Sequence, residues 1–541
     1  MEILREMTRR QHELGYLSDE TLSALAKQFG VPLYRIEGLA SFYTSFRRDP
    51  PPKVTVTVCR DVTCAMAGSC SAKQQLCDEL SKGSQSDDVE VVEVSCIGRC
   101  DSAPAVAIND HPVAPLSLNE LEQVVGLIEK PDLATHDMSP SFTAARCDPY
   151  PSVSERYSTV KQLVAEGEVG PVCIERLKAS QLRGMGGAGF PTGMKWEFVR
   201  SELAEPKYVV CNADESEPGT FKDREILENL PHLVIEGMVL AALTIGAEEG
   251  IVFLRHEYER EKASLDAALQ QARAAGILGD NAAGSGQAFD IEVFLSPGGY
   301  ILGEETALLE ALEDKRGEPR NKPPYPGTFG LWGKPTLVNN VETFAFATAI
   351  VNKGNQWWKA QGKDEFTGLK FVSVSGDVVN PGVHEIPLGT TVAELIELCG
   401  GMKDDTPLKA FLPGGASSNF LPADKVDTPL DFDAMKQAGS MLGTGAVVVI
   451  NESHDLFELA TNIVKFFRNE SCGKCVPCRV GSEKSVELLE SVQAGTTSAT
   501  QLAVLSDLGD TLEQTSICGL GQVALNPILS MMKHFPNEVP Q

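Results

Sequence analysis

The sequence predicts a multi-domain protein of the α/β and α+β classes. The chain has 541 residues, strand-like and helical patterns alternate over long stretches, and eight of its 14 cysteines fall into one group of four near each end. At roughly 100 to 200 residues per domain, this length allows about three to five domains. A hydrophobic fraction of 42% and a charged fraction of 23% are ordinary for globular protein.

Charge and hydropathy exclude several functions. A formal net charge of -28 at pH 7 repels phosphate backbones, and no basic run offsets it, so we expect no nucleic-acid partner. The longest mainly apolar run, residues 232–247, is short and contains Glu236, and residues 1–17 lack the apolar core of a signal peptide. We therefore expect a cytoplasmic protein without a membrane association.

The N-terminal part divides into two predicted units. Residues 1–52 predict a helical lead-in, in which Ser18 is a candidate N-cap and Gly30 ends one helix shortly before Pro32 lets the next begin. In residues 53–130 the segments VTVTV, VEVVEV and AVAIND predict short strands around a helical stretch. This order suits a thioredoxin-like domain.

Four further units follow. Residues 131–159 carry prolines and serines without periodicity and predict a linker. Residues 160–354 alternate strand-like runs with helical ones, which predicts a largely parallel, Rossmann-like domain. Residues 365–451 contain a predicted hairpin around residues 380–382 and then a short helix, which fits a β-grasp (ubiquitin-like, SLBB-like) domain. Residues 455–541 predict a C-terminal helical bundle.

The two cysteine groups are the strongest chemical signal. The C-terminal group is C-x2-C-x2-C with one distant thiol, which favours a 4Fe–4S cluster over zinc, because zinc more often uses two C-x2-C pairs. The N-terminal group is two separated pairs beyond strand ends, which favours a 2Fe–2S cluster over zinc or free thiols. The predicted ligands are Cys472, Cys475, Cys478 and Cys518 in the C-terminal quartet, and Cys59, Cys64, Cys96 and Cys100 in the N-terminal quartet. The other six cysteines, Cys70, Cys77, Cys147, Cys173, Cys211 and Cys399, are expected to be buried as small apolar residues.

A glycine-rich stretch is a candidate ligand loop. Gly184, Gly186 and Gly189 match G-x-G-x-x-G formally, but they follow no obvious strand. The stretch either brings backbone N–H groups and Lys195 to a phosphate or planar ring, or is a packing turn.

Polar residues gather in three more stretches, and each group either binds a ligand or has an ordinary structural role. The residues at and just after the end of the strand YVVCNA lie either at the ligand-binding edge of a parallel sheet or in a solvated acidic loop. The other two groups lie at helix starts and either bind a ligand or cap helices. The three groups are Asn212, Asp214, Glu215 and Glu217; Gly303, Glu304 and Glu305; and Asn339 and Asn340.

The motifs together resemble a known family. GMGGAGFPTGMKW, CNADESEPGTFKDR, GEETALLEAL, KPPYPGTFGLWGKPTLVNNVET and ESCGKCVPCR with SICGLG are similar to the NADH-oxidising flavoprotein subunit of respiratory complex I and its relatives. The N-terminal part resembles the thioredoxin-like 2Fe–2S subunit of the same module, here fused upstream. The resemblance covers nearly the whole chain and implies four cofactors: FMN, NAD(H), one 2Fe–2S cluster and one 4Fe–4S cluster.

The resemblance also implies binding residues. FMN would lie among Gly184, Gly186, Lys195, Asn212, Asp214, Glu215, Gly303, Asn339 and Asn340. NADH would contact Phe190, Lys195, Phe198, Glu217, Glu305, Lys322 and Tyr325. No catalytic side chain is expected, because hydride passes directly between the nicotinamide and the flavin, and the flavin converts it into single electrons.

The partner subunit is inferred from one residue that departs from the complex I motif and from the fusion of the two modules in one chain. Met185 stands where complex I relatives carry arginine, and an apolar residue there resembles the β (diaphorase) subunit of soluble NAD-dependent formate dehydrogenases, which are also fused. That resemblance implies a catalytic α subunit with a molybdenum or tungsten pterin cofactor and further iron–sulfur clusters, and the reaction formate + NAD+ = CO2 + NADH. One alternative is the diaphorase subunit of a NAD-reducing NiFe hydrogenase. A non-enzymatic alternative is a zinc-stapled assembly scaffold.

Overall fold

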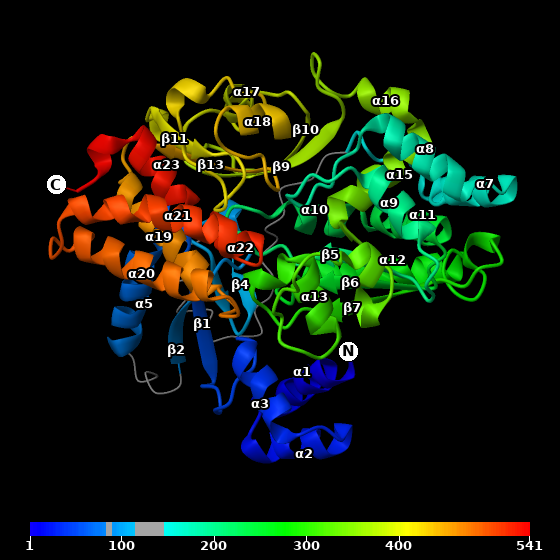
Figure 1. Cartoon of the computed structure of the whole chain (residues 1–541), viewed down its shortest axis with the longest axis horizontal. Helices are drawn as coiled ribbons and strands as arrows, with labels where there is room; N and C mark the ends of the chain where they lie inside the picture. The colour runs from blue at the N-terminus through cyan, green and yellow to red at the C-terminus, as the bar shows by residue number, and fades with distance from the viewer. Residues whose placement is uncertain (83–88, 114–144, 541) are drawn as a thin grey trace.

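The computed structural model describes residues 1–82, 89–113 and 145–540 (Figure 1). The predictions for residues 114–130 and for the linker over residues 131–144 lie outside the described residues. The multi-domain α/β and α+β class predicted from the sequence is confirmed: two mixed sheets, one parallel sheet and a C-terminal helical region lie along the chain.

Three helices open the chain, and they pack beneath the central domain (Figure 1). They are α1 (Glu2–Leu14), α2 (Asp19–Phe29) and α3 (Leu33–Phe42). Ser18 caps α2 as predicted, since its hydroxyl accepts the Thr21 N–H at 3.2 Å. The ammonium of Met1 pairs with Asp314 at 2.8 Å, which ties these helices to the central domain.

The first sheet has the order β2-β1-β3-β4, with β1 and β2 parallel and the other pairs antiparallel. Its elements are β1 (Val54–Cys59), α4 (Val62–Met66), α5 (Ser69–Lys82), β2 (Val89–Val94), β3 (Val106–Ile108) and β4 (His111–Val113). The valines of β1 share one face as the alternation predicted, and Thr55 and Thr57 on the other face are buried as well. Of the six extra cysteines, Cys70 is exposed and Cys77 half-buried on α5, so the burial prediction was wrong for these two.

The central sheet is entirely parallel, in the order β7-β6-β5-β8, as the alternating pattern predicted. Its strands are β5 (Tyr208–Ala213), β6 (Glu249–Leu254), β7 (Asp290–Leu295) and β8 (Thr336–Asn340). The surrounding helices are α7 (Ser158–Glu166), α8 (Val169–Ser180), α9 (Thr192–Ser201), α10 (Lys222–Asn229), α11 (Pro231–Ile245), α12 (Glu259–Ala274), α13 (Glu305–Leu312), α14 (Pro326–Phe329), α15 (Val341–Lys353) and α16 (Asn355–Lys359). In the described part of the chain no single helix is long and apolar enough to cross a membrane; α10 and α11 together reach that length and composition but are bent by 92°.

The second mixed sheet, in the order β10-β9-β13-β11-β12, places a parallel β9–β13 pair at its centre. Its elements are β9 (Leu369–Gly376), β10 (Gly382–Pro387), α17 (Val392–Leu398), β11 (Leu408–Leu412), β12 (Leu421–Pro422), α18 (Phe432–Gln437) and β13 (Ala446–Asn451). Strands β9 and β10 form the predicted hairpin.

The C-terminal helices lie between the second mixed sheet and the N-terminal sheet (Figure 1). They are α19 (Leu456–Asn469), α20 (Val476–Gln493), α21 (Val504–Thr515), α22 (Gly519–Val523) and α23 (Asn526–His534). Asn462 on α19 donates to the Arg60 carbonyl at 2.9 Å, and Ser95 donates to Glu470 at 2.6 Å. These bonds hold the N-terminal sheet against the C-terminal helices.

Candidate functional site

A cavity of about 320 Å³ opens at the carboxyl ends of the central strands. Its volume lies in the range of about 300–1,000 Å³ that is usual for ligand pockets. We call it the sheet-edge cavity. The predicted binding residues that line it are Gly186, Asn212, Asp214, Glu215, Glu217, Gly303 and Asn340.

Strand register brings these residues together. Strands β5 and β8 are parallel neighbours, and Asn212 is paired with Asn340 across the ladder. The carboxyl ends of parallel strands are the usual ligand-binding edge of an open α/β sheet. Asn212 also donates to the Gly303 carbonyl at 2.9 Å, which joins this edge to the segment before α13.

The glycine-rich stretch forms a closed loop between α8 and α9. The Gly184 N–H donates to the Phe190 carbonyl at 2.8 Å, so Gly184 shapes the loop without lining the cavity. A Cβ on Gly186 would lie 3.0 Å from the Asn340 Cβ, and Gly187 has a φ of +117°. Glycine suits the close approach at Gly186 and the positive φ at Gly187, and without side chains there the loop exposes its backbone to the cavity.

The acidic stretch after β5 is buried, so the solvated-loop alternative is wrong. Burial raises the pKa of Asp214, of Glu215 and of Glu217 to about 7 each. Glu217 accepts the Ser417 N–H at 2.8 Å, and Asp214 accepts the Ser296 hydroxyl at 3.1 Å. These carboxyl groups therefore change charge near neutral pH inside the cavity.

The helix-capping alternatives are confirmed for two residues. Glu304 accepts the N–H groups of Thr306 at 2.9 Å and Ala307 at 3.0 Å, so it caps α13, and it also lines the cavity. Asn340 caps α15 and also lines the cavity. Asn339 does neither, because its side chain accepts the Trp196 indole N–H at 2.9 Å away from the cavity lining.

The remaining predicted residues form a second group outside the cavity lining. Phe190, Phe198 and Tyr325 are 46%, 52% and 62% exposed, and the rings of Phe190 and Phe198 are 6.5 Å apart. Glu305 bridges Lys195 at 3.2 Å and Lys322 at 3.3 Å. Burial would raise the pKa of Glu305, but the two lysines lower it overall. We call these six residues the outer aromatic group; exposed aromatic rings beside paired charges suit a planar ligand with phosphates.

The N-terminal quartet is assembled and buried. Cys59 ends β1, Cys64 lies in α4, and Cys96 and Cys100 follow β2 with their sulfurs 3.4 Å apart. Backbone N–H groups point at three of the sulfurs, a pattern that suits thiolate ligands of an iron–sulfur cluster. The bonds are Gly98 to Cys96 at 3.4 Å, Ala105 to Cys64 at 3.4 Å and Gly219 to Cys100 at 3.3 Å. The residues present therefore fit a cluster.

The C-terminal quartet adjoins the sheet-edge cavity. Cys475 and Cys478 lie at the start of α20, and Cys518 directly precedes α22. A Cβ on Gly521 of α22 would lie only 2.9 Å from the Cys478 Cβ, so the two helices meet closely. Gly519 and Leu520, which follow Cys518 in the chain, line the cavity.

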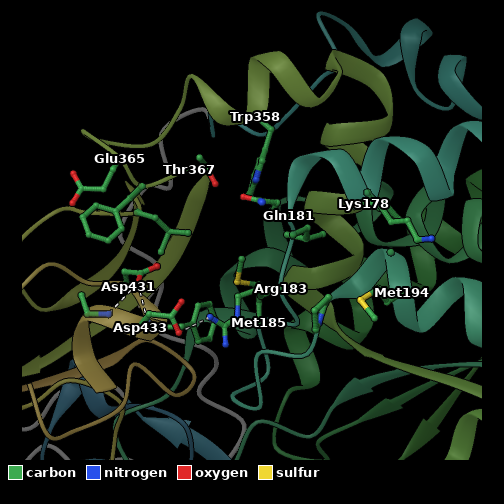
Figure 2. Close-up of a pocket in the computed structure, with 18 of the residues that line it drawn as sticks. Lys178, Gln181, Arg183, Met185, Met194, Trp358, Glu365, Thr367, Asp431 and Asp433 are labelled. Carbon is green, nitrogen blue, oxygen red and sulfur yellow. Dashed lines mark hydrogen bonds and ion pairs between the residues drawn. The ribbon is translucent and has the colours of Figure 1, made fainter. Parts of the chain in front are cut away.

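A second cavity of about 950 Å³ lies on the other side of the glycine-rich loop (Figure 2). It lies between α8 and α9 on one side and α18 on the other, and none of the predicted binding residues lines it. Met185 faces this second cavity, whereas its neighbour Gly186 lines the sheet-edge cavity. Arg183 packs over the Phe432 ring at 4.5 Å and pairs with Asp433 at 3.2 Å.

Several lining residues of the sheet-edge cavity were missed by sequence reasoning. They are Ser417, Met441, Gly443 and Thr444 from the second mixed sheet region, and Gly519, Leu520 and Val523 from the C-terminal region. The position of Gly519 and Leu520 beside Cys518 was the one available signal. Nothing in the local pattern around Ser417 or Thr444 pointed to the cavity.

Fold and site thus define a class of protein: a multi-domain α/β protein whose sheet-edge ligand cavity adjoins two cysteine quartets. Four family models match. They are a thioredoxin-like [2Fe-2S] ferredoxin over residues 1–129, the Nuo51 FMN-binding domain over residues 177–349, the SLBB domain over residues 371–418 and the NADH-ubiquinone oxidoreductase-F iron-sulfur binding region over residues 458–541.

Curated relatives agree with these models. The second F-type subunit of the NADH-quinone oxidoreductase of Rhizobium meliloti is 44% identical over 376 residues, which is 69% of this chain and 89% of the relative. The F-type subunit of the Escherichia coli enzyme is 42% identical over 368 residues, or 68% and 83% of the two chains. A solved NAD+-reducing [NiFe]-hydrogenase matches with a TM-score of 0.85 and 32% identity over 99% of this chain and 92% of that one. The protein belongs to the family of F-type NADH-quinone oxidoreductase subunits, the NADH-oxidising subunits of complex I-like enzymes.

The chain accordingly binds FMN, NAD(H), one 2Fe–2S cluster and one 4Fe–4S cluster. It is a NAD-dependent flavin and iron–sulfur oxidoreductase subunit. A zinc-stapled scaffold without flavin does not fit this family.

Proposed function

We propose that the chain exchanges a hydride between NAD(H) and FMN and passes single electrons between FMN and a partner subunit through its clusters. One observation carries the proposal: the sheet-edge cavity borders both quartets. Leu520 lines the cavity two residues after Cys518, and Gly219, beside the lining residue Thr220, donates to Cys100. Bound FMN would supply the conversion between a two-electron hydride and single electrons.

The cavity-lining residues would hold FMN. Gly186 and its neighbour Gly187 would offer backbone N–H groups to an anionic group, since glycine has no side chain of its own to block the approach. The amides of Asn212 on β5 and Asn340 on β8 lie at the same edge of the sheet and offer polar contacts to the ring. Gly184 and Asn339 would act without touching FMN. Gly184 closes the glycine-rich loop, and Asn339 holds the Trp196 side chain.

The outer aromatic group would receive the nicotinamide nucleotide. Phe190 and Phe198 present exposed rings for stacking, and Tyr325 adds a third. Lys195 and Lys322 would meet the phosphates; in the structure both pair with Glu305, at 3.2 and 3.3 Å, and Lys322 also pairs with Glu304 at 2.6 Å. Glu217 is buried in the cavity itself, so its contact with NADH would come from the cavity side.

We propose that the partner is the molybdenum or tungsten subunit of a soluble formate dehydrogenase and that the pair works in the cytoplasm. Met185 and the fusion of the two modules support this assignment through the resemblance to formate dehydrogenase β subunits. A NiFe hydrogenase partner is the second candidate, and the full-length similarity to a NAD+-reducing [NiFe]-hydrogenase favours it.

Metal analysis separates the two candidates. The complex is purified anaerobically from its native host through a tag on this chain, and iron, molybdenum, tungsten and nickel are measured. Molybdenum or tungsten, with formate-driven reduction of NAD+, supports the first candidate. Nickel with hydrogen-driven reduction supports the second. Iron alone, with neither donor active, contradicts both partners.

A further inference from the structure

Arg255 connects the N-terminal quartet to the sheet-edge cavity. The residue follows β6, and only 2% of its surface is exposed. Its Nη1 donates to the Glu215 carbonyl at 2.5 Å, and its Nη2 donates to the Cys96 carbonyl. Glu215 lines the cavity and Cys96 is a predicted cluster ligand, so one guanidinium holds the backbone of both sites.

Two further contacts from the central domain reach the same quartet. Arg224 of α10 donates to the Gly98 carbonyl at 2.6 Å, within the loop that joins Cys96 to Cys100. The Gly219 N–H donates directly to the Cys100 sulfur at 3.3 Å. The central domain therefore supplies one hydrogen bond to a ligand sulfur and two buried cations beside the ligand loop.

Acidic neighbours offset these cations. Glu257 pairs with Arg255 at 2.9 Å, and Asp101 pairs with Arg224 at 2.8 Å. Glu225 and Glu261 lie 3.1 and 4.0 Å from Arg224, and Asp61 accepts the Cys96 N–H at 2.6 Å. Each arginine is thus matched by carboxylates, and changing either member of the Arg255–Glu257 pair alters the local charge by one.

We propose that the central domain sets the reduction potential of the N-terminal cluster, with Arg255 as the main positioning residue. Reduction adds one electron to the cluster, and no bond forms or breaks. A buried cation and N–H bonds to sulfur stabilise the more negative reduced form, and cluster potentials respond to both. The inference rests on cluster binding by the N-terminal quartet.

The test is a redox titration of the full chain followed by electron paramagnetic resonance, with Arg255→Gln and Glu257→Gln as opposite changes. Arg255→Gln should lower the ratio of reduced to oxidised 2Fe–2S cluster at fixed potential about tenfold, which is 59 mV for a one-electron couple. Glu257→Gln leaves the guanidinium unpaired and should shift the potential upward. Arg273→Gln is the matched control, because Arg273 carries the same charge but pairs with Asp290 at the surface, 42% exposed.

The signal of the 4Fe–4S cluster in the same samples serves as an internal reference and should move little. Equal shifts for Arg255→Gln and Arg273→Gln, or shifts of the same sign for Arg255→Gln and Glu257→Gln, would overturn the proposal. If Arg255→Gln loses the cluster, the upward shift in Glu257→Gln decides the question alone. Absence of any 2Fe–2S signal in the unaltered chain would instead refute the ligand assignment.

Discussion

At the scale of single residues, Asp214 should make flavin binding depend on pH. Its pKa is raised to about 7 by burial, so it is mainly neutral at pH 6 and charged at pH 8. An anionic ligand is favoured below that pKa and is opposed as pH rises through it. A repulsion of about 1 kcal/mol corresponds to a roughly fivefold rise in the Kd of FMN.

The measurement is the fluorescence of FMN released on dilution at pH 6 and pH 8. Asp214→Asn should flatten the difference in part, because Glu215 and Glu217 also titrate near pH 7. Identical pH profiles for the variant and the unaltered chain would show that Asp214 does not face the anion.

Phe190 should matter for NADH and not for FMN. Its ring is exposed in the outer aromatic group, and the loss of one aromatic stacking contact costs about 0.5–1.5 kcal/mol. We expect Phe190→Ala to raise the KM for NADH roughly two- to tenfold in a dye-reduction assay while the FMN content stays unchanged. Tyr34→Ala removes an exposed ring on α3 and should leave both quantities unaltered. A variant that lost FMN but kept its KM for NADH would contradict the assignment.

At the scale of elements, a buried ionic network joins β9 to α10 and α15. Glu342 at the start of α15 pairs with Lys370 at 2.6 Å and with Lys222 at 3.0 Å, and all three side chains are fully buried. Lys222 also pairs with Asp223, which lines the sheet-edge cavity, at 2.7 Å. The network therefore positions one wall of the cavity against the second mixed sheet.

Removing one member of this network should destabilise the protein. Breaking a buried ion pair from one side typically costs about 3–5 kcal/mol, because a charge stays buried without its partner. We expect Lys370→Met to lower the thermal unfolding midpoint, measured by circular dichroism, by several degrees. Lys363→Met removes an exposed lysine paired with Glu394 and should change the unfolding midpoint little. Equal shifts of the midpoint in the two variants would mean that the buried network contributes no more to stability than a surface ion pair.

At the scale of the whole molecule, three domains build one cavity, so a change in one should be felt in another. Cys518→Ala should remove the 4Fe–4S cluster and also weaken FMN retention, because Gly519 and Leu520 line the cavity. Cys64→Ala should remove the 2Fe–2S cluster but keep FMN, since Cys64 is held within its own domain by the Ala105 N–H. Iron content and flavin fluorescence measure both effects. Equal flavin loss in the two variants would contradict the shared-wall interpretation.

Local features were the ones that sequence reasoning predicted well. The cap at Ser18, the hairpin between β9 and β10 and the parallel central sheet each depend on residues within one segment or on a repeated pattern. Packing between segments could not be predicted in this way. Thr55 and Thr57 lie on a strand that is buried on both faces, which alternation alone cannot reveal.

The sequence by itself determined which groups are the candidates for this protein's chemistry. The cysteine spacings, the glycine-rich loop and the polar residues after the strands depend on short chain distances, so they can be recognised before folding is known. Only the tertiary structure decided how these groups meet: the pairing of β5 with β8, the walls from Ser417 and Leu520, and the bridge from Arg255 to Cys96. Those contacts join residues that are far apart in the chain, and they form because burial of the domain cores fixes the relative positions of the elements.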